Sequence, residues 1–422
     1  MFDRLKKIVH NNSKDSNKQQ PLTPTESTGT HGNGLRTCVY YSDWSIYERK
    51  HFPEQIPLDL VTNIFYAFFN IDPNSGEVKL SDPWADTDIE FQSPYDSNKK
   101  INGLLARFYE IKQHSRHVKV SMSIGGWSYS DNFKKGTDSE AKLSKFVDSA
   151  LKSMIEYGFD GIDLDWEYPE NRIEAAQYLQ IMKKLREGMR NLETEHGLSK
   201  DSFLLTIASP AFAEKLDIFN VEEMDKFLSF WNLMTYDFAG SWSDKTGYHC
   251  NLYKKSQDEL CADDSIKYFL SKGISSSKLV LGMANYGRSF TNTDGFGKPF
   301  QGVGPGSDGE QGFWFYNKLP MSGSNEEYDS KAVIGFNYNK DTKTFVSYDT
   351  VDSVSTKAQY VIDNKLGGGM WWESCGDKYD DPDRSLINSF VKKIGNDQLD
   401  SSSNVIDCYD SSEYLKKNFG DI

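Results

Sequence analysis

Residues 159–168 read FDGIDLDWEY, a stretch in which apolar and acidic side chains alternate. Because successive side chains of a β-strand point to opposite faces, the alternation predicts a strand with one apolar and one acidic face. The apolar face would carry Ile162, Leu164 and Trp166, and the acidic face would carry Asp163, Asp165 and Glu167. Asp160 has the opposite parity from the acidic face, so we expect it to support the base of the strand.

The acidic face favours a functional site over a structural one. Neighbouring carboxylates on it would lie roughly 7 Å apart, and their repulsion would let one of them keep a proton near neutral pH. A solvated strand edge and a calcium loop are the structural alternatives. Calcium loops scatter their oxygen ligands through turn residues, whereas Trp166 and the helix-like segment after it favour a buried strand–helix unit.

Composition narrows the class of protein. The chain has 422 residues, 37% of them hydrophobic, which suits one barrel-sized domain with an insertion as well as two domains. The net charge of −14 argues against a nucleic-acid partner and against adsorption to an anionic membrane. Aromatic residues make up 14% of the chain and would fill a core or line a stacking groove for flat, neutral ligands. We expect a monomer.

The cysteines and histidines show no metal-binding pattern. The five cysteines are scattered, with no C-x-x-C motif and no ordered spacing to the seven histidines, so we expect no zinc site, no other metal and no cofactor. Cys250 and Cys261 could pair across a loop, but the odd count suits a reducing compartment at least as well.

The two ends of the chain differ from its middle. Residues 1–35 open with an apolar run too short for a signal segment and continue as a polar stretch that we expect to be disordered. No apolar run is long enough to span a membrane, and we expect a cytoplasmic or unconventionally exported protein. Residues 396–422 are a polar, acidic extension with one short terminal helix expected.

Between these ends, strand-like and helix-like segments alternate. The predicted strands are residues 37–42, 61–69, 118–124, 158–165, 203–208, 230–236, 279–283 and 368–372. The predicted helices are residues 98–114, 139–157, 170–196, 221–227, 258–272, 351–363 and 384–394. Eight strands, most of them followed by a helix, predict an α/β protein with a (β/α)8 barrel over residues 36–395. A Gly-rich, aromatic stretch at about 290–348 predicts a small α+β insertion between the seventh strand and its helix.

Active sites of such barrels lie at the carboxyl ends of the strands. Many polar and aromatic residues of this chain fall there: Tyr40, Trp44, Phe68, Gly126, Trp127, Asp165, Glu167, Met234, Tyr236, Asp237, Tyr286, Arg288 and Trp372. Any one tryptophan among them is more typical of packing than of ligand stacking. Their joint placement at one end of the barrel is what indicates a site.

At these residues the chain resembles the family 18 glycoside hydrolases, the chitinases with a (β/α)8 barrel. Its D-x-x-D-x-D-x-E motif at residues 160–167 matches the signature of that family. Four shorter matches support the resemblance: S-x-G-G at 123–126, M-x-Y-D at 234–237, Y-G-R at 286–288 and G-G-x-M-x-W at 367–372. The resemblance covers roughly residues 36–395 and leaves both ends of the chain unexplained.

The resemblance implies four catalytic residues. Glu167 would protonate the glycosidic oxygen and later activate water. Asp165 would hold the N–H of the substrate's N-acetyl group, with Asp163 behind it sharing a proton. Tyr236 would donate a hydrogen bond to the acetamido oxygen as this oxygen attacks the anomeric carbon.

The resemblance also implies how the sugar chain is bound. Trp372 would form the floor of the cleavage subsite, aided by Tyr40 and Phe68. Sugar hydroxyls or the acetamido group would meet Asp237, Tyr286 and Arg288. Neighbouring subsites would be lined by Trp44, Trp127 and Trp242, and the substrate-binding set also includes Gly126 and Met234.

The residues independently fit this chemistry. Most retaining glycosidases use a second carboxylate as nucleophile about 5 Å from the acid, but a substrate acetamide can replace it. The protein then needs an acid of raised pKa, a carboxylate that orients the amide and a phenol for its oxygen. The chain offers all three groups.

The leading hypothesis is a chitinase acting on β-1,4-linked N-acetylglucosamine polymers or oligomers. A non-catalytic chitin-binding lectin is the first alternative, disfavoured because the terminal acid, Glu167, is present. An endo-β-N-acetylglucosaminidase acting on N-glycans is the second, disfavoured by the insertion and the aromatic series. Residues 283–285, Met-Ala-Asn, depart from the family pattern and could change one wall of the groove.

Overall fold

A computed structural model describes residues 34–420 of the chain. The predicted disordered tail and the segment on which the expected localisation rests fall almost wholly on residues 1–33, outside the described part. At the edge of the described part, Leu35 forms a parallel bridge with Leu399, so contacts with the barrel domain begin one residue before its predicted start at residue 36.

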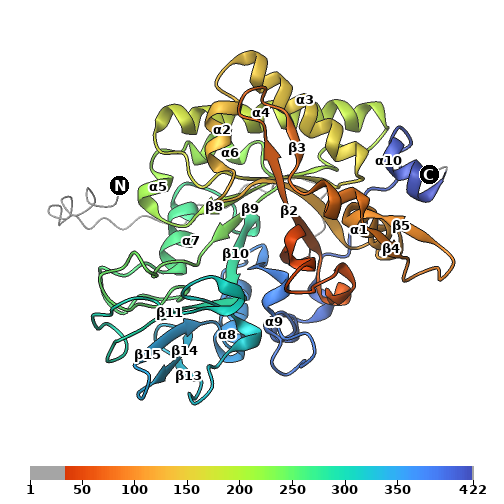
Figure 1. Ribbon diagram of the computed structural model, residues 1–422. Helices are drawn as coiled ribbons and strands as arrows, with labels where there is room; N and C mark the ends of the chain where they lie inside the picture. The colour runs from red at the N-terminus through yellow and green to blue at the C-terminus, as the bar shows by residue number, and fades with distance from the viewer. Residues whose placement is uncertain (1–33, 421–422) are drawn as a thin grey trace.

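Eight parallel strands close into a barrel, which confirms the predicted fold (Figure 1). The strands are β1 (Arg36–Ser42), β2 (Asn63–Ile71), β6 (Lys119–Gly125), β7 (Gly161–Asp165), β8 (Leu204–Pro210), β9 (Phe230–Met234), β10 (Leu279–Ala284) and β16 (Gly368–Trp372). Their order is β1-β16-β10-β9-β8-β7-β6-β2, and pairing of β1 with β2 completes the ring. A short strand, β3 (Val78–Leu80), adds antiparallel to β2.

Helices surround the barrel, and all seven predicted helices are present, whereas α2 and α5 were not predicted. They are α1 (Gly103–His114), α2 (Ser130–Gly136), α3 (Glu140–Glu156), α4 (Arg172–Glu195), α5 (Ala213–Leu216), α6 (Val221–Asp225), α7 (Ala262–Ser271), α8 (Val351–Asp363) and α9 (Leu386–Ile394). Between β1 and β2 the described chain has only the 3-10 turns η1 (Asp43–Ile46), η2 (Pro53–Gln55) and η3 (Leu58–Leu60). Helix α1 starts later than predicted because residues before it form the hairpin of β4 (Glu90–Gln92) and β5 (Lys100–Asn102).

The alternation in residues 159–168 is confirmed by packing. Trp166 points outward, where its ring stacks on Phe133 of α2 at 5.2 Å and meets Tyr178 of α4 edge-on at 5.5 Å. Ile162 and Leu164 are buried in the same layer between barrel and helices. Because one face of β7 is committed to this core, the carboxylates of the other face must point into the barrel.

Asp160 supports the base of the barrel, as predicted. Its carboxylate accepts the backbone N–H groups of Val120 and Val405, each at 2.7 Å, and pairs with the buried Lys112 Nζ at 3.1 Å. Val405 belongs to the C-terminal extension, so this contact also fastens that extension to the end of the barrel opposite the catalytic face.

The C-terminal extension is packed against the barrel rather than free. Helix α10 (Glu413–Phe419) lies beside the β4–β5 hairpin, where Asn418 Oδ1 accepts the backbone N–H of Asn102 at 2.7 Å (Figure 1). Tyr409 is buried, and its hydroxyl donates to the Phe159 carbonyl at 2.7 Å. The extension is therefore part of the folded unit.

The predicted insertion is a five-stranded antiparallel sheet between β10 and α8 (Figure 1). Its strands are β11 (Tyr286–Phe290), β12 (Phe313–Phe315), β13 (Glu327–Asp329), β14 (Ile334–Asn339) and β15 (Thr344–Tyr348). It begins at Tyr286 rather than near residue 290, and the described chain between β11 and β15 has 3-10 turns, η6 (Ser307–Gly309) and η7 (Tyr316–Lys318), but no α-helix.

All five cysteines are unpaired in this structure, so Cys250 and Cys261 do not form a disulfide here. Across the described residues, no helix has the length and apolar character needed to cross a bilayer.

Candidate active site

The carboxylates of β7 line up along the barrel interior, and Asp163 is the deepest of them. It is fully buried and accepts hydrogen bonds from Tyr40 Oη at 2.8 Å, Ser123 Oγ at 2.9 Å and Thr206 Oγ1 at 2.6 Å. Burial raises the pKa of Asp163, while these hydrogen bonds act in the opposite direction. Protein hydroxyl groups therefore already donate to both carboxylate oxygens of Asp163.

Asp165 follows Asp163 toward the carboxyl end of the barrel and is less well satisfied. It is buried, and in the described part of the chain its Oδ1 atom meets no hydrogen-bond donor. Burial, followed by the charges of Glu167 and Asp163, raises its pKa well above the usual range. A buried acceptor without a donor costs free energy, so this atom is suited to receive an N–H group from a ligand.

Glu167 stands just beyond the end of β7 and is half-buried. Its backbone N–H donates to Ser130 Oγ at 2.7 Å, which fixes the turn that carries it. Burial, and after it the nearby charge of Asp237, raises the pKa of Glu167 to about 7. At neutral pH the side chain is therefore divided between its acid and base forms, which is what a group serving in turn as both requires.

Tyr236 lies just past β9 and faces the same carboxylates. It is buried, and its hydroxyl lies 3.9 Å from Met370 Sδ, a weak acceptor. Burial, then the charges of Asp165, Glu167 and Asp237, raises the pKa of Tyr236 well above its ordinary value. The hydroxyl therefore stays protonated and can donate a hydrogen bond to a ligand.

Asp237 and Arg288 form a bidentate ion pair at the rim. Arg288 Nε lies 2.8 Å from Asp237 Oδ1, and Arg288 Nη2 lies 3.0 Å from Asp237 Oδ2. Burial alone would raise the pKa of Asp237, but Arg288 holds it well below its usual range. Arg288 also covers the rings of Trp242, Tyr286 and Phe313 at 5.3–5.5 Å, which places Trp242 at the edge of the same site.

Aromatic rings extend the site away from the carboxylates. Trp372, half-buried at the end of β16, stacks on Phe68 of β2 with ring centroids 5.7 Å apart and planes 18° apart. Phe68 in turn stacks on the exposed Trp44 of η1 at 6.1 Å, and Trp127 after β6 is 74% exposed. Such rings suit the flat faces of neutral sugars.

The sequence pattern of the family "Glycosyl hydrolases family 18" matches residues 36–377. The protein is a family 18 glycosyl hydrolase. Sporulation-specific chitinase 2 of Saccharomyces cerevisiae is 41% identical, over 85% of this chain and 79% of that protein. Endochitinase 1 of Metarhizium robertsii is 36% identical, over 93% of this chain and 92% of that protein.

Solved structures agree with this family 18 assignment. The catalytic domain of psychrophilic chitinase B from Arthrobacter TAD20 superposes with a TM-score of 0.77 at 25% identity, over 88% of this chain and 99% of that one. The family 18 chitinase of Cycas revoluta in complex with (GlcNAc)3 superposes with a TM-score of 0.70 at 27% identity, over 86% of this chain and 99% of that one.

Five residues predicted to bind substrate in this family 18 enzyme are buried, and one of them is Phe68, which lies between Trp372 and Trp44. Tyr40 lies beneath Trp372, with ring centroids 5.5 Å apart, and its hydroxyl is bound to Asp163, so it supports the floor rather than forming its surface. Tyr286 and Met234 are also almost completely covered. Gly126 has a φ of +75°, and a Cβ there would lie 2.5 Å from the Phe68 ring, so glycine permits this close packing.

Several residues that shape the family 18 site escaped the sequence prediction. Ser130 accepts the backbone N–H of Glu167, and the Thr206 hydroxyl donates to Asp163. The Tyr168 hydroxyl hydrogen-bonds the Glu167 side chain, but the sequence analysis gave Tyr168 no role. His249 is buried behind Asp237, with Nδ1 3.8 Å from Asp237 Oδ1. Apart from Tyr168, which ends the 159–168 stretch, these residues lie outside the sequence patterns, and only their distance from the carboxylates identifies them.

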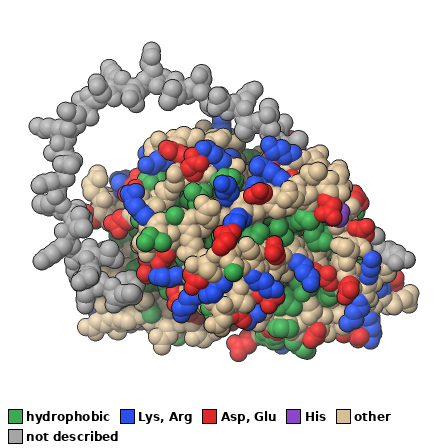
Figure 2. All heavy atoms as spheres, turned by 90° about the horizontal axis from the view of Figure 1, so that it is seen from above, with side chains coloured by type: hydrophobic (Ala, Val, Ile, Leu, Met, Phe, Trp, Pro, Cys, Tyr) green, Lys and Arg blue, Asp and Glu red, His purple; other side chains and the backbone are tan. Residues whose placement is uncertain are grey.

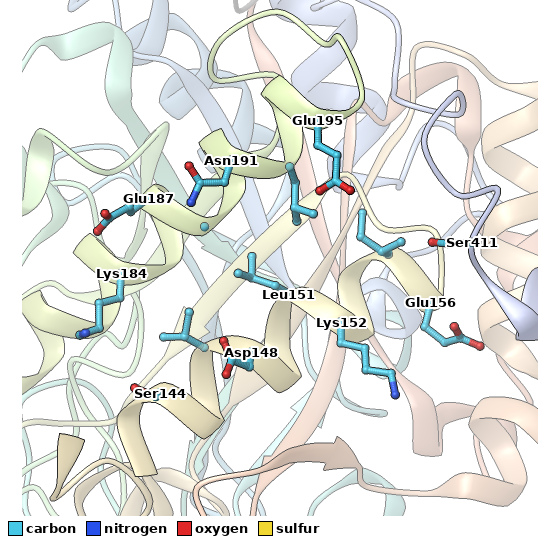
Figure 3. Close-up of a pocket in the computed structure, with 14 residues that line it drawn as sticks. Ser144, Asp148, Leu151, Lys152, Glu156, Lys184, Glu187, Asn191, Glu195 and Ser411 are labelled. Atoms are coloured by element: carbon cyan, nitrogen blue, oxygen red, sulfur yellow. The ribbon is translucent and has the colours of Figure 1, made fainter. Parts of the chain in front are cut away.

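A separate hollow of about 630 Å³ lies between α3 and α4 on the outside of the barrel (Figure 3). Leu151 and Val147 contribute to its lining, with Glu187 and Lys184 among the charged residues around it, and Ser411 of the C-terminal extension at one end. Figure 2 views this side of the family 18 enzyme, where Lys and Arg side chains mix with Asp, Glu and apolar ones. The hollow contains none of the predicted site residues.

Proposed function

We propose that the protein is a chitinase that hydrolyses β-1,4-linked N-acetylglucosamine chains with retention of configuration, using the acetamido group of the substrate as nucleophile. The observation that carries the proposal is Glu167, with a pKa of about 7, beside Asp165 and Tyr236 at the mouth of the barrel. The chitinase names of the relatives and the (GlcNAc)3 complex of a structural neighbour support the substrate class.

In the first step, protonated Glu167 gives its proton to the glycosidic oxygen while the acetamido oxygen attacks the anomeric carbon. The bond from this carbon to the leaving sugar breaks, and a cyclic oxazolinium intermediate forms. Asp165 Oδ1, which lacks a donor in the protein, would accept the acetamido N–H. The Tyr236 hydroxyl would donate to the acetamido oxygen and so hold the amide for attack.

In the second step, the Glu167 carboxylate takes a proton from water as the water oxygen attacks the anomeric carbon. The bond from this carbon to the acetamido oxygen breaks, and the acetamide is restored. Two inversions at one carbon leave the product as the β-anomer. All groups in this scheme come from one chain, which supports the proposal that the enzyme acts as a monomer.

The first test of the proposed function is the anomeric form of the product. Hydrolysis of chitotetraose followed by NMR during the first minutes should show new reducing ends as the β-anomer, before mutarotation. Release of the α-anomer would contradict the use of the acetamide. Hydrolysis of a high-mannose glycoprotein without hydrolysis of chitotetraose would favour an endo-β-N-acetylglucosaminidase, and binding without turnover would favour a lectin.

The pKa of Glu167 predicts the pH dependence. The first step needs the protonated acid, so kcat/KM for chitotriose should fall about tenfold per pH unit above about pH 7, as that proton is lost. Since Asp237 contributes to the raised pKa, Asp237→Asn should move this alkaline limb to lower pH. A profile that stays flat from pH 6 to 9 would contradict the role of Glu167 as acid.

Tyr236→Phe tests the hydrogen bond to the acetamido oxygen. The variant keeps the ring and its edge contact with Tyr286, whose centroid lies 6.1 Å away, and loses only the hydroxyl. We expect kcat for chitotriose to fall about 10²-fold, the usual effect of removing one such donor. Tyr253→Phe, which changes an exposed tyrosine on the outer surface, is the matched control and should retain wild-type kcat.

A further inference from the structure

We propose that His249 is a positioning residue for Asp237: a proton taken up by His249 draws the Asp237 carboxylate out of its pairing with Arg288 and so sets the acid limit of hydrolysis. The proposal rests on the proposed function, because it concerns the pH range over which the same site works. His249 touches no substrate in this scheme and acts only through Asp237.

The His249 side chain is completely buried where the long segment after β9 meets the insertion sheet. Its backbone N–H donates to Ser347 Oγ of β15 at 3.1 Å, and its backbone carbonyl accepts the N–H of Phe238 at 2.9 Å. Its Nε2 atom lies 3.1 Å from the carbonyl oxygen of Tyr286. A carbonyl oxygen can only accept, so Nε2 carries the hydrogen of the neutral ring. These contacts fix the ring in place.

The other ring nitrogen, Nδ1, faces a second acceptor. It lies 3.8 Å from Asp237 Oδ1, which is too far for a hydrogen bond, and it meets no hydrogen-bond partner in the part of the chain that the structure describes. Although burial acts in the opposite direction, Arg288 holds the pKa of Asp237 well below its usual range, so the lone pair of neutral Nδ1 meets a negative charge. One proton on Nδ1 would replace this repulsion with a charge-assisted hydrogen bond, whose usual length is about 2.8 Å.

Closing this gap moves the carboxylate rather than the ring, because Tyr286 holds the ring at its other nitrogen. Asp237 Oδ1 also accepts Arg288 Nε at 2.8 Å, so a shift of about 1 Å toward His249 lengthens the bidentate pair. Arg288 in turn covers the ring of Trp242 at 5.5 Å, at the edge of the site. The wall of the site made by Arg288 and Trp242 is therefore disturbed once His249 is protonated, which weakens substrate binding.

The surroundings of His249 place this proton uptake on the acid side of neutrality. Burial lowers the pKa of His249, the charge of Asp237 opposes this, and the charge of Arg288 adds to it. Asp349, which follows β15, also favours the proton, but Lys357 Nζ of α8 binds its two oxygens at 2.6 and 2.7 Å. The Cys250 thiol, 3.4 Å from Nε2, is a weaker partner for this nitrogen than the Tyr286 carbonyl. The ring is therefore neutral at pH 7 and gains its proton below the ordinary histidine pKa of about 6.5.

Two substitutions separate the roles of the two ring nitrogens. The amide nitrogen of glutamine can replace Nε2, so His249→Gln keeps the donor to Tyr286 and offers no proton to Asp237. The amide nitrogen of asparagine can replace Nδ1, so His249→Asn offers Asp237 a permanent donor.

The measured quantity is kcat/KM for chitotriose at about pH 4.5 and at pH 7. We expect the ratio of the first value to the second to be about fivefold higher in His249→Gln than in wild type, the usual effect of one hydrogen bond. At pH 7, kcat/KM of His249→Asn should lie about fivefold below that of His249→Gln, mainly through KM. His196→Gln, at the C-terminal end of α4, is the matched control and should show the wild-type ratio. Equal losses in both His249 variants with an unmoved acid limb would mean a purely structural role and would overturn the proposal.

Nitrogen NMR of protein labelled in its histidine rings follows the proton on His249 without turnover, and the spectrum of His249→Gln identifies its signals. The pKa of His249 should fall in Asp237→Asn, because the carboxylate that favours the proton is gone. An unchanged pKa, or a ring that gains no proton before the protein unfolds, would overturn the proposal. A wild-type protein that shows this titration but hydrolyses chitotriose at no pH would overturn the proposed function and leave the pairing of His249 with Asp237 standing.

Discussion

Glu167→Gln should abolish hydrolysis of a chitotriose reporter, with kcat reduced at least about 10³-fold, while the protein still binds chitooligosaccharides. Glutamine has nearly the shape of glutamate, and its amide can still accept the backbone N–H of Trp127 that the carboxylate accepts. It can neither give up nor take a proton. Because Glu167 acts as acid in one step and as base in the other, its loss should slow both steps, and one such group contributes about 10² to 10⁴ in rate.

Two measurements separate this loss from unfolding or loss of binding. Isothermal titration with chitotetraose should give an affinity within a few-fold of wild type, because Trp372, Phe68 and Asp165 are unchanged. Glu170→Gln, an exposed residue three positions further along the chain, should keep full activity. Wild-type turnover by Glu167→Gln would remove the basis of the proposed mechanism.

The fold and the carboxylate row could be predicted because both follow from local sequence patterns. Alternation through residues 159–168 places the acids on the inner face, and the outward packing of Trp166 on Phe133 and Tyr178 confirms it. The eight strands and most of the helices could be predicted for the same reason, because their apolar residues recur with the period of a strand or of a helix. Helix α8 was predicted at the bounds that the structure shows, because a Thr350 cap and a clear apolar stripe define it.

What could not be predicted depends on contacts between distant residues. Tyr40 hydrogen-bonds Asp163, 123 positions away, and this contact makes it a support for the carboxylate rather than a surface for sugar. Tyr286 and Arg288 belong to the first strand of the insertion sheet, although they follow β10 so closely that they resemble a continuation of the barrel. The buried Tyr409 in a polar extension carries no periodic signal at all.

Asp165→Asn is the second large effect that we expect. Asp165 is buried with one oxygen lacking a donor, and its role is to accept the acetamido N–H and hold the amide for attack. Asparagine can turn its NH₂ toward that N–H, and it carries no charge to stabilise the positive charge that develops on the amide. Loss of one such electrostatic contact costs about 10² to 10³ in kcat, so we expect a drop in that range on chitotriose.

The same substitution should change the pH profile, which a purely structural defect would not do. The charge of Glu167 raises the pKa of Asp165, and because the interaction between two charges is mutual, we expect loss of the Asp165 carboxylate to lower the pKa of Glu167. The alkaline limb of kcat/KM in Asp165→Asn should therefore lie at lower pH than in wild type. Asp131→Asn, at an exposed position in the first turn of α2, is the control and should leave both kcat and the limb unchanged. If kcat falls but the alkaline limb does not move, the charge of Asp165 does not affect the pKa of Glu167. The proposed electrostatic interaction between the two carboxylates would then be wrong.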